Sequence, residues 1–373
     1  MQRFSGRVAG LDASRTTLMF FGLVVHASAI GAGLQVVTDA PADNASILIS
    51  IFGHNFRMPA FFMVSGIFSA YLLNTRGLQR FWAQRRRRLV YPLLAASLTL
   101  LPVSYWILLG APASFEQVLS LGTLHLWFIY YLIWFSLAVI LIEWLLGKAN
   151  RSIVNANVRP LGFWLVNPVT IIVIAILSTL IPHWFDESSG ALQNNSSLFP
   201  PIGLVTYYSL FFLFGLLLYR YWVSAEKWLR QFWPMHLLLG LAAFAFSTAS
   251  YWGFSNGGWL FLSYSLTSWM LSLSILGIFL FFVRQESRFV RYLSDASYWI
   301  YLIHYPIMVI LQRWFAELKT GLPLALLLGI TIDVAVSLGL YQIFVKDKWI
   351  GLFLAGKLPS QIDAKRRKKP KTH

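Results

Sequence analysis

Residues 11–33 read LDASRTTLMFFGLVVHASAIGAG, an apolar stretch in which ten residues separate Arg15 from His26. A helix rises about 1.5 Å per residue, so His26 lies roughly 16 Å deeper than Arg15. A bilayer core is about 30 Å thick, which puts His26 near mid-depth if Arg15 marks the interface. A titratable side chain there is expected to face protein or a wet cavity. Two interpretations stay open: a packing histidine bonded to a neighbouring helix, or a group that moves a proton near neutral pH.

The composition indicates a polytopic membrane protein. The chain has 373 residues, of which 57% are hydrophobic and only 12% are charged. A soluble surface needs far more charge than this. Cysteine is absent, which excludes disulfides, thiolate catalysis and cysteine metal sites. The sequence has no evident cleavable signal, so the first apolar segment is expected to stay as a spanning helix.

Hydropathy predicts an all-α integral membrane protein with about ten transmembrane helices. The second span contains His54, Arg57 and Pro59, and we expect it to be tilted, kinked or partly re-entrant, because proline removes a helix hydrogen bond. The ten spans are expected at residues 16–35, 46–73, 89–110, 124–146, 166–183, 203–221, 235–252, 259–283, 296–314 and 323–345.

Basic residues gather before span one and after spans two, four, six, eight and ten, whereas the opposite loops hold only Arg313 and Lys319. The positive-inside rule therefore predicts that both termini are cytoplasmic. This asymmetry accounts for the net charge of +16 without nucleic acid. We expect one membrane domain, 1–350, and a basic cytoplasmic tail, 351–373, which is solvated or contacts anionic lipid. The loop at 184–201 is interpreted as a flexible linker, with a lid as the alternative.

The segment HNFRMPAFFMVSG, residues 54–66, places His54 and Arg57 three positions apart, on one face if it is helical. An arginine inside a span needs a partner or an anionic ligand. One interpretation makes His54, Arg57 and Ser65 contacts for a substrate or transition state. The other is a structural polar network that holds a broken helix. We favour function for Arg57 and leave His54 open.

The run RFWAQRRRRLVYP, residues 80–92, lies at the cytoplasmic face before span three. Clustered arginines such as Arg85 and Arg88 suit the phosphates of a soluble cofactor or substrate. On charge alone, a topology signal that also contacts lipid headgroups is the favoured interpretation.

Two aromatic segments carry the remaining candidates. LHLWFIYYL, residues 124–132, places His125 and Trp127 at the extracytoplasmic interface, where an aromatic belt is the default and sugar stacking the alternative. SDASYWIYLIHYP, residues 294–306, places Tyr301 and His304 on one helix face. Asp333 lies in the last span, where bonds to neighbouring hydroxyls are favoured over a pair with an inward histidine or arginine.

The sequence has no P-loop, dinucleotide fingerprint, GxSxG elbow or clustered metal-ligand spacing. We therefore expect no metal, and the residues by themselves allow a transmembrane transferase or a transporter. No clear internal repeat is present, which weakly disfavours the commoner transporter folds.

Taken together, these segments resemble the membrane-bound acyltransferase-3 family. The resemblance is carried by LDASRTTLMFFGLVVHA, FRMPAFFMVSG, the arginine run before YP, LHLWFIYYL and SDASYWIYLIHYPI, which extend over most of the chain. The spacing from Arg15 to His26 is that family's hallmark. Within the family, HNFRMPAFFMVSGIFSAYLL and the closing LYQIF…GLFLAGKLP are similar to the glucan-modifying succinyltransferase branch.

The resemblance implies a multi-pass protein of the bacterial inner membrane, surrounded by its lipids. It would transfer an acyl group from cytoplasmic acyl-CoA to a hydroxyl of a periplasmic glucan or another envelope glycan. Succinyl-CoA, or acetyl-CoA as the alternative, is then a substrate, and no cofactor is permanently bound.

In this hypothesis His26 removes the proton of the sugar hydroxyl, and Arg57 stabilises the oxyanion. A covalent acyl-histidine is the alternative mechanism. Arg15, oriented by Asp12, would hold CoA phosphates together with Arg85 or Arg88. The expected substrate contacts are His54, Ser65, His125, Trp127, Tyr301 and His304. The rival function, a transporter of acyl donor or glycan, predicts substrate movement without chemical change.

Overall fold

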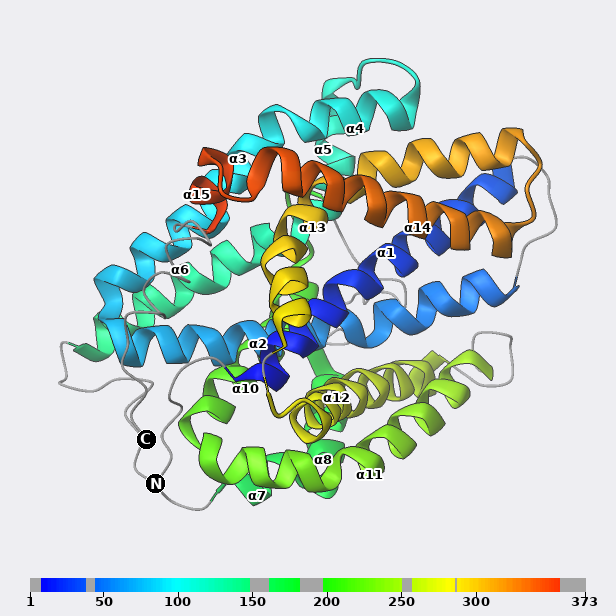
Figure 1. Cartoon of the computed structure of the whole chain (residues 1–373). Helices are drawn as coiled ribbons and strands as arrows, with labels where there is room; N and C mark the ends of the chain where they lie inside the picture. Colours follow the sequence, from blue (N-terminus) through cyan, green and yellow to red (C-terminus); the bar gives the residue numbers. More distant parts are fainter. Residues whose placement is uncertain are drawn as a thin grey trace.

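The computed structural model describes residues 8–37, 44–147, 161–181, 197–249, 257–285 and 287–355. These ranges are built of helices and turns, and they contain no β-strand (Figure 1). The elements in chain order are α1 (Ala9–Val37), α2 (Asn44–Arg85), the π-helix η1 (Arg86–Val90), α3 (Tyr91–Leu98), α4 (Leu100–Leu109), α5 (Phe115–Leu121), the 3-10 helix η2 (Leu124–Leu126), α6 (Trp127–Gly147), α7 (Gly162–Val166), α8 (Pro168–Ser178), α10 (Ile202–Arg220), α11 (Trp222–Ala249), α12 (Gly257–Phe282), α13 (Arg288–Glu317), α14 (Leu322–Leu340), the π-helix η5 (Tyr341–Val345) and α15 (Trp349–Ala355).

Within the described ranges, seven helical stretches are long and apolar enough to cross a membrane. The helices α4 and α8 are apolar but shorter, and α13 is long but is not one of the seven. The all-helical membrane fold is thus confirmed, whereas the count of about ten spans and the cytoplasmic termini stay predictions. The seven stretches are Ala9–Gly31, Asn44–Leu98, Phe115–Gly147, Ile202–Arg220, Trp222–Ala249, Trp259–Phe282 and Leu322–Val345.

The expected second span is a helix that continues through His54, Arg57 and Pro59. The re-entrant alternative is therefore wrong, because the backbone stays helical at these residues. The non-helical residue in α2 is Gly77, with φ 74° and ψ 171°, which comes after the expected second span at 46–73. A positive φ suits glycine because it has no Cβ.

The expected third span consists of η1, α3 and α4, with an irregular residue at Thr99 between the last two. Its far end is held by Arg313 of α13. The Arg313 guanidinium donates to the carbonyls of Ile107 and Leu108, the latter at 2.6 Å. Carbonyls in the last turn of a helix lack intrahelical partners, so a cation there stabilises the end of α4.

The helix α1 lies at the centre of the bundle and packs against α2, α12, α13 and α14. The pair α2 and α10 approaches most closely at Gly66 and Gly215. A Cβ added at Gly66 would lie 2.1 Å from the Phe212 carbonyl oxygen, and one added at Gly215 would lie 2.0 Å from that of Met63. Glycine at both positions therefore lets two backbones touch, as is common between helices in membranes.

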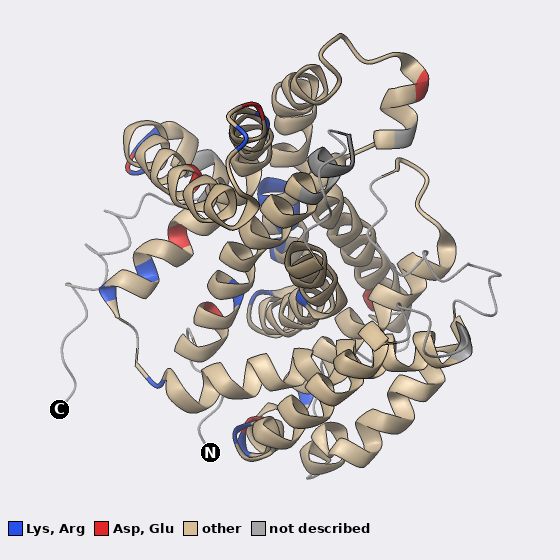
Figure 2. Ribbon diagram, turned by 90° about the vertical axis from the view of Figure 1, so that its right-hand side faces the viewer, with Lys and Arg blue, Asp and Glu red and all other residues tan. Residues whose placement is uncertain are grey.

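The C-terminal ends of α1, α11 and α13 and the starts of α2, α12 and α14 lie at one end of the bundle, on the right in Figure 1. The C-terminal end of α2, the start of α11 and α15 lie on the left, and we call this the basic end. Basic residues concentrate there, among them Arg76, Arg80, Lys227, Lys346 and Lys348. Figure 2 shows how sparse charge is along the rest of the ribbon.

Two sequence predictions fall largely outside the described residues. Most of the loop at 184–201 lies there, as do residues 356–373 of the expected tail. The first residues of that tail, 351–355, are helical and belong to α15.

Candidate functional site

The helices α1 and α13 run side by side in the same direction, which pairs polar groups at two levels. At the basic end, Arg15 Nη2 donates to Ser294 Oγ at 2.9 Å. Further along, the rings of His26 and His304 lie 5.2 Å apart between centroids. The two levels are about 16 Å apart by helix rise. The spacing between Arg15 and His26 in α1 is therefore matched by the spacing between Ser294 and His304 in α13.

Three histidines from three elements meet at the deeper level. His125 of η2 lies 5.2 Å from His304 between ring centroids, and His304 contacts His26. The sequence did not single out Tyr305, whose ring stacks on His125 at 4.8 Å and meets His26 edge-on at 5.8 Å. Its position directly after His304 is the signal that could have found it. We call these four residues the imidazole cluster.

Backbone carbonyls fix the tautomers of two of these histidines. A carbonyl can only accept, so His304 Nδ1 must donate to Tyr301 O at 2.8 Å, and His125 Nε2 must donate to Leu302 O at 3.1 Å. The other ring nitrogens, His304 Nε2 and His125 Nδ1, are buried and have no hydrogen-bond partner in the described structure. When neutral, both histidines thus present a free lone pair inside the bundle. His26 itself is only partly buried.

Tyr301 holds η2 in place. Its hydroxyl donates to the His125 carbonyl oxygen at 2.7 Å. This bond ties α13 to the start of α6 and so sets the position of the His125 ring relative to His304. Tyr301 belongs to the site predicted from the sequence, and here it positions a neighbour.

Arg57 is a buried cation, with 5% of its surface exposed. Its guanidinium lies against α1 at Gly22, one helical turn before His26, and a Cβ at Gly22 would stand 2.3 Å from Arg57 Nη1. No carboxylate in the described ranges pairs with it, and its Nε has no partner there. A buried arginine in this state suits an anion.

The other predicted contacts on α2 are bonded within that helix. His54 Nδ1 donates to the Ser50 carbonyl oxygen at 2.8 Å. The Ser65 carbonyl oxygen accepts from Ser69 Oγ at 2.7 Å. His54 lies about one helical turn before Arg57 in α2, and Ser65 lies further along the same helix, toward the basic end.

The three arginines expected to bind CoA are brought together at the basic end. Arg85 Nη2 donates to Ser69 Oγ at 2.6 Å, and the Arg15 guanidinium lies 5.8 Å from the centroid of Phe68. Both guanidinium groups therefore contact the same turn of α2. Arg88 is exposed, and its carbonyl oxygen accepts from the Tyr298 hydroxyl at 2.6 Å.

Two supporting residues have defined partners. Asp12 Oδ1 lies 3.8 Å from Arg15 Nη2, one helical turn away. Asp333 is fully buried and accepts from Ser337 Oγ at 3.0 Å. No histidine or arginine in the described ranges bonds to Asp333, so the hydroxyl contact, which the sequence favoured, is the one present.

The belt interpretation of His125 and Trp127 is wrong. Each side chain is only 3% exposed, because η2 and the start of α6 turn inward instead of facing lipid. Trp127 packs on Phe62, Tyr131 and Tyr208 at centroid distances of 6.2, 5.1 and 5.5 Å. Trp127 therefore belongs to an aromatic group formed by α2, α6 and α10.

The arrangement combines an imidazole that is partly open, two further imidazole lone pairs, and a buried cation that has no counter-ion among the described residues. In the part of the chain that the structure describes, no cluster of three or more histidine and acidic side chains could hold a metal ion. A second set of cations lies about 16 Å away along α1, at the basic end.

Comparison with known proteins identifies the class. A family model described as an acyltransferase domain matches residues 8–342, which include every site residue named above. The chain therefore belongs to the acyltransferase-3 family. It is 25% identical to the glucans biosynthesis protein C of Escherichia coli O6:K15:H31 (strain 536 / UPEC) over 367 residues, covering 93% of this chain and 94% of that protein. The same values hold for the protein of that name from Escherichia coli (strain K12). No solved structure matches the chain.

Proposed function

We propose that this acyltransferase is a multi-pass protein of the bacterial inner membrane that transfers an acyl group, succinyl in preference to acetyl, from cytoplasmic acyl-CoA to a hydroxyl of a periplasmic glucan. The single observation that carries the proposal is the meeting of His26, His304 and His125 beside Arg57, on helices that also lead to the arginines of the basic end. The relatives named glucans biosynthesis protein C support a glucan acceptor.

His26 acts as the general base in this mechanism. As its ring nitrogen takes the proton of a sugar hydroxyl, the oxygen attacks the thioester carbonyl carbon. The carbonyl oxygen becomes negative, and the Arg57 guanidinium stabilises it. The carbon–sulfur bond then breaks, the ester remains on the sugar, and the proton held by His26 passes to the CoA thiolate. An acyl-histidine intermediate is the alternative, with the same atoms exchanged in two steps.

The free lone pairs of His304 and His125 suit hydroxyl donors. A sugar presents several hydroxyls, so His304 Nε2 and His125 Nδ1 would accept hydrogen bonds from those next to the attacking oxygen. A buried acceptor that lacks its donor is costly, which makes the pair a means of selecting a polyhydroxyl acceptor.

Arg15, Arg85 and Arg88 would hold the phosphates of CoA, since clustered guanidinium groups pair well with phosphate oxygens. The extended arm of CoA then follows α1 toward His26. For a succinyl donor, the free carboxylate also needs a buried cation, and Arg57, assisted by His54, is the candidate.

The decisive experiment uses the full-length chain, purified and reconstituted in vesicles with succinyl-CoA or acetyl-CoA and a linear or cyclic glucan. We expect mass spectrometry to find an ester-linked succinyl group on the glucan and an equal amount of free CoA. Movement of glucan or acyl-CoA across the vesicle without a mass change would instead identify a transporter. Transfer of acetyl at the higher rate would reassign the donor and leave the transferase class intact.

A further inference from the structure

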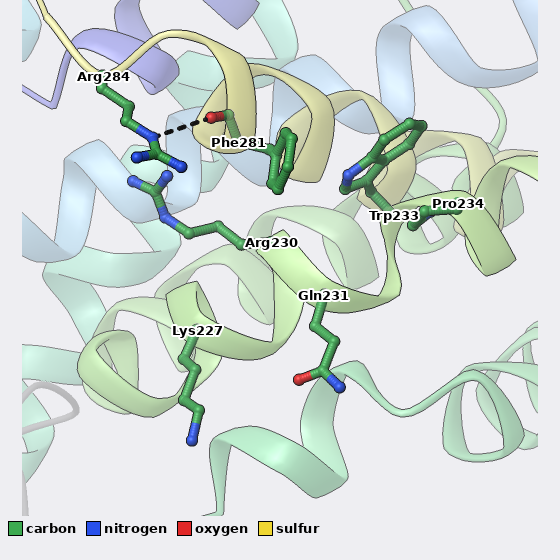
Figure 3. Close-up of a pocket in the computed structure, with 7 residues that line it drawn as sticks. All are labelled: Lys227, Arg230, Gln231, Trp233, Pro234, Phe281 and Arg284. Carbon is green, nitrogen blue, oxygen red and sulfur yellow. Dashed lines mark hydrogen bonds between the residues drawn. The ribbon is translucent and has the colours of Figure 1, made fainter.

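A groove lies between α11 and α12 at the basic end, on helices that do not contribute to the imidazole cluster. Its volume is about 470 Å³, and its lining includes Lys227, Arg230, Trp233, Phe281 and Arg284 (Figure 3). The function proposed above makes no use of this groove or of its cations.

The guanidinium group of Arg230, in α11, and that of Arg284, two residues after the end of α12, point toward one another (Figure 3). Arg230 Nη2 donates to Glu226 at 2.8 Å. Arg284 Nε donates only to the Phe281 carbonyl oxygen, at 3.4 Å, and no carboxylate in the described ranges pairs with it. Lys227 also lines the groove, but its side chain points away from the two arginines (Figure 3), and its Nζ lies 5.2 Å from the centroid of the Trp228 ring. Among the described residues at this end of the groove, two facing guanidinium groups and one carboxylate leave a positive charge, and an anion between the two arginines would relieve their repulsion.

The other half of the groove is apolar. The Phe281 ring lies between the two arginines and Trp233 (Figure 3), and the Trp233 ring is 6.1 Å from that of Phe281 and 5.8 Å from that of Phe282 between centroids. Phe282 is 64% exposed, although it is the last residue of a membrane-spanning helix. The lining of the groove is therefore cationic at one end and aromatic at the other. The same change from charged to apolar groups occurs at a membrane interface.

We propose that this groove binds an anionic phospholipid, with its phosphate between Arg230 and Arg284 and one acyl chain along Trp233, Phe281 and Phe282. Guanidinium forks match phosphate oxygens. The exposed aromatic rings lie where an acyl chain begins, which a free phosphate or nucleotide would leave uncovered. The basic side of a membrane protein is also the side where anionic headgroups are attracted.

The test compares lipids that share acyl chains and differ in headgroup charge. Purified full-length protein in a neutral detergent is titrated with phosphatidylglycerol, phosphatidylcholine or inorganic phosphate, and bound lipid is counted by native mass spectrometry. We expect retention of one phosphatidylglycerol, at least tenfold weaker retention of phosphatidylcholine, and no displacement by millimolar inorganic phosphate.

The variant Arg284→Gln is expected to weaken phosphatidylglycerol binding roughly tenfold, as for the loss of one charge-assisted hydrogen bond. Arg288→Gln is the matched control, because it removes the same charge from an exposed residue at the start of α13, outside the groove. Equal binding by Arg284→Gln and the unmodified protein would overturn the proposal. Equal losses in both variants, or full displacement by phosphate, would overturn it too. Acyl transfer in detergent is expected to be unchanged in Arg284→Gln.

Discussion

The ring of His26 in α1 lies 5.2 Å from that of His304 in α13, although the two residues are near opposite ends of the chain. The same pair of helices joins Arg15 to Ser294 at the basic end. Two parallel helices thus connect a cationic surface to an imidazole pair deep in the bundle. In the function proposed above, this pairing sets the distance between the proposed acyl-CoA site and the proposed site of transfer, and most of the predictions below depend on it.

Replacing His26 with alanine is expected to abolish acyl transfer while leaving an inserted, folded protein. Removal of a general base lowers the rate by about 10²- to 10⁴-fold. The measurement is CoA release by purified protein, with a melting curve to verify folding. A His26→Ala protein that transfers at a near-normal rate would show that the base is another residue.

Replacing His304 with phenylalanine keeps the ring volume and removes the free Nε2 lone pair. We expect transfer to fall by about 10- to 100-fold through loss of a buried acceptor, whereas His304→Gln, which keeps an acceptor oxygen, should retain more activity. His236→Phe is the control, because His236 is a buried histidine of α11 outside the cluster. Equal rates for His304→Phe and His304→Gln would show that His304 does not act as a hydrogen-bond acceptor in transfer.

Gly22→Ala places a methyl group where Arg57 Nη1 now lies, at 2.3 Å. The guanidinium is the far end of a flexible side chain, so it should shift and leave the fold intact. We expect little change in melting temperature but a clear fall in kcat, because the oxyanion contact depends on position. Gly339→Ala is the control, since a Cβ there meets nothing within 4 Å. Normal kcat in Gly22→Ala would show that Arg57 acts elsewhere.

Gly66→Ala is expected to act on stability instead. Its Cβ would stand 2.1 Å from the Phe212 carbonyl oxygen, and a backbone atom cannot move aside as a side chain can. Overpacking of this kind costs about 1–3 kcal/mol, so the melting temperature in detergent should fall, while Gly339→Ala should not lower it. An unchanged melting curve would mean that α2 and α10 can separate freely.

Arg15→Ala and Arg88→Ala are expected to weaken acyl-CoA binding and to leave the acceptor KM unchanged. Each removes a cation from the basic end, where charge-assisted bonds to phosphate contribute about 1.5–3 kcal/mol. Ser294→Ala is a milder companion change, because it removes only the hydroxyl that holds Arg15. The measurement is acyl-CoA affinity by calorimetry. Unchanged affinity in both arginine variants would mean that the arginines at 85–88 serve as a topology signal and do not bind CoA.

The sequence by itself determined the class and the polar residues. A chain with 57% hydrophobic residues and 12% charged ones must place its helices in lipid, and apolar runs of this length must be helical there, because every backbone group needs an internal partner. The depth of His26 relative to Arg15 followed from helix rise alone. The helix rise does not tell which faces of α1, η2 and α13 turn toward one another.

Only the tertiary structure decided the neighbours. Lipid-facing and protein-facing apolar surfaces look alike in a sequence, so His125 and Trp127 read as interfacial residues until the packing of η2 buried them. Proline at position 59 suggested a broken helix, whereas surrounding helices keep α2 continuous and the irregular residue is Gly77. The meeting of His26 with His304, and of Arg57 with Gly22, depends on contacts between segments far apart in the chain, which local spacing does not encode.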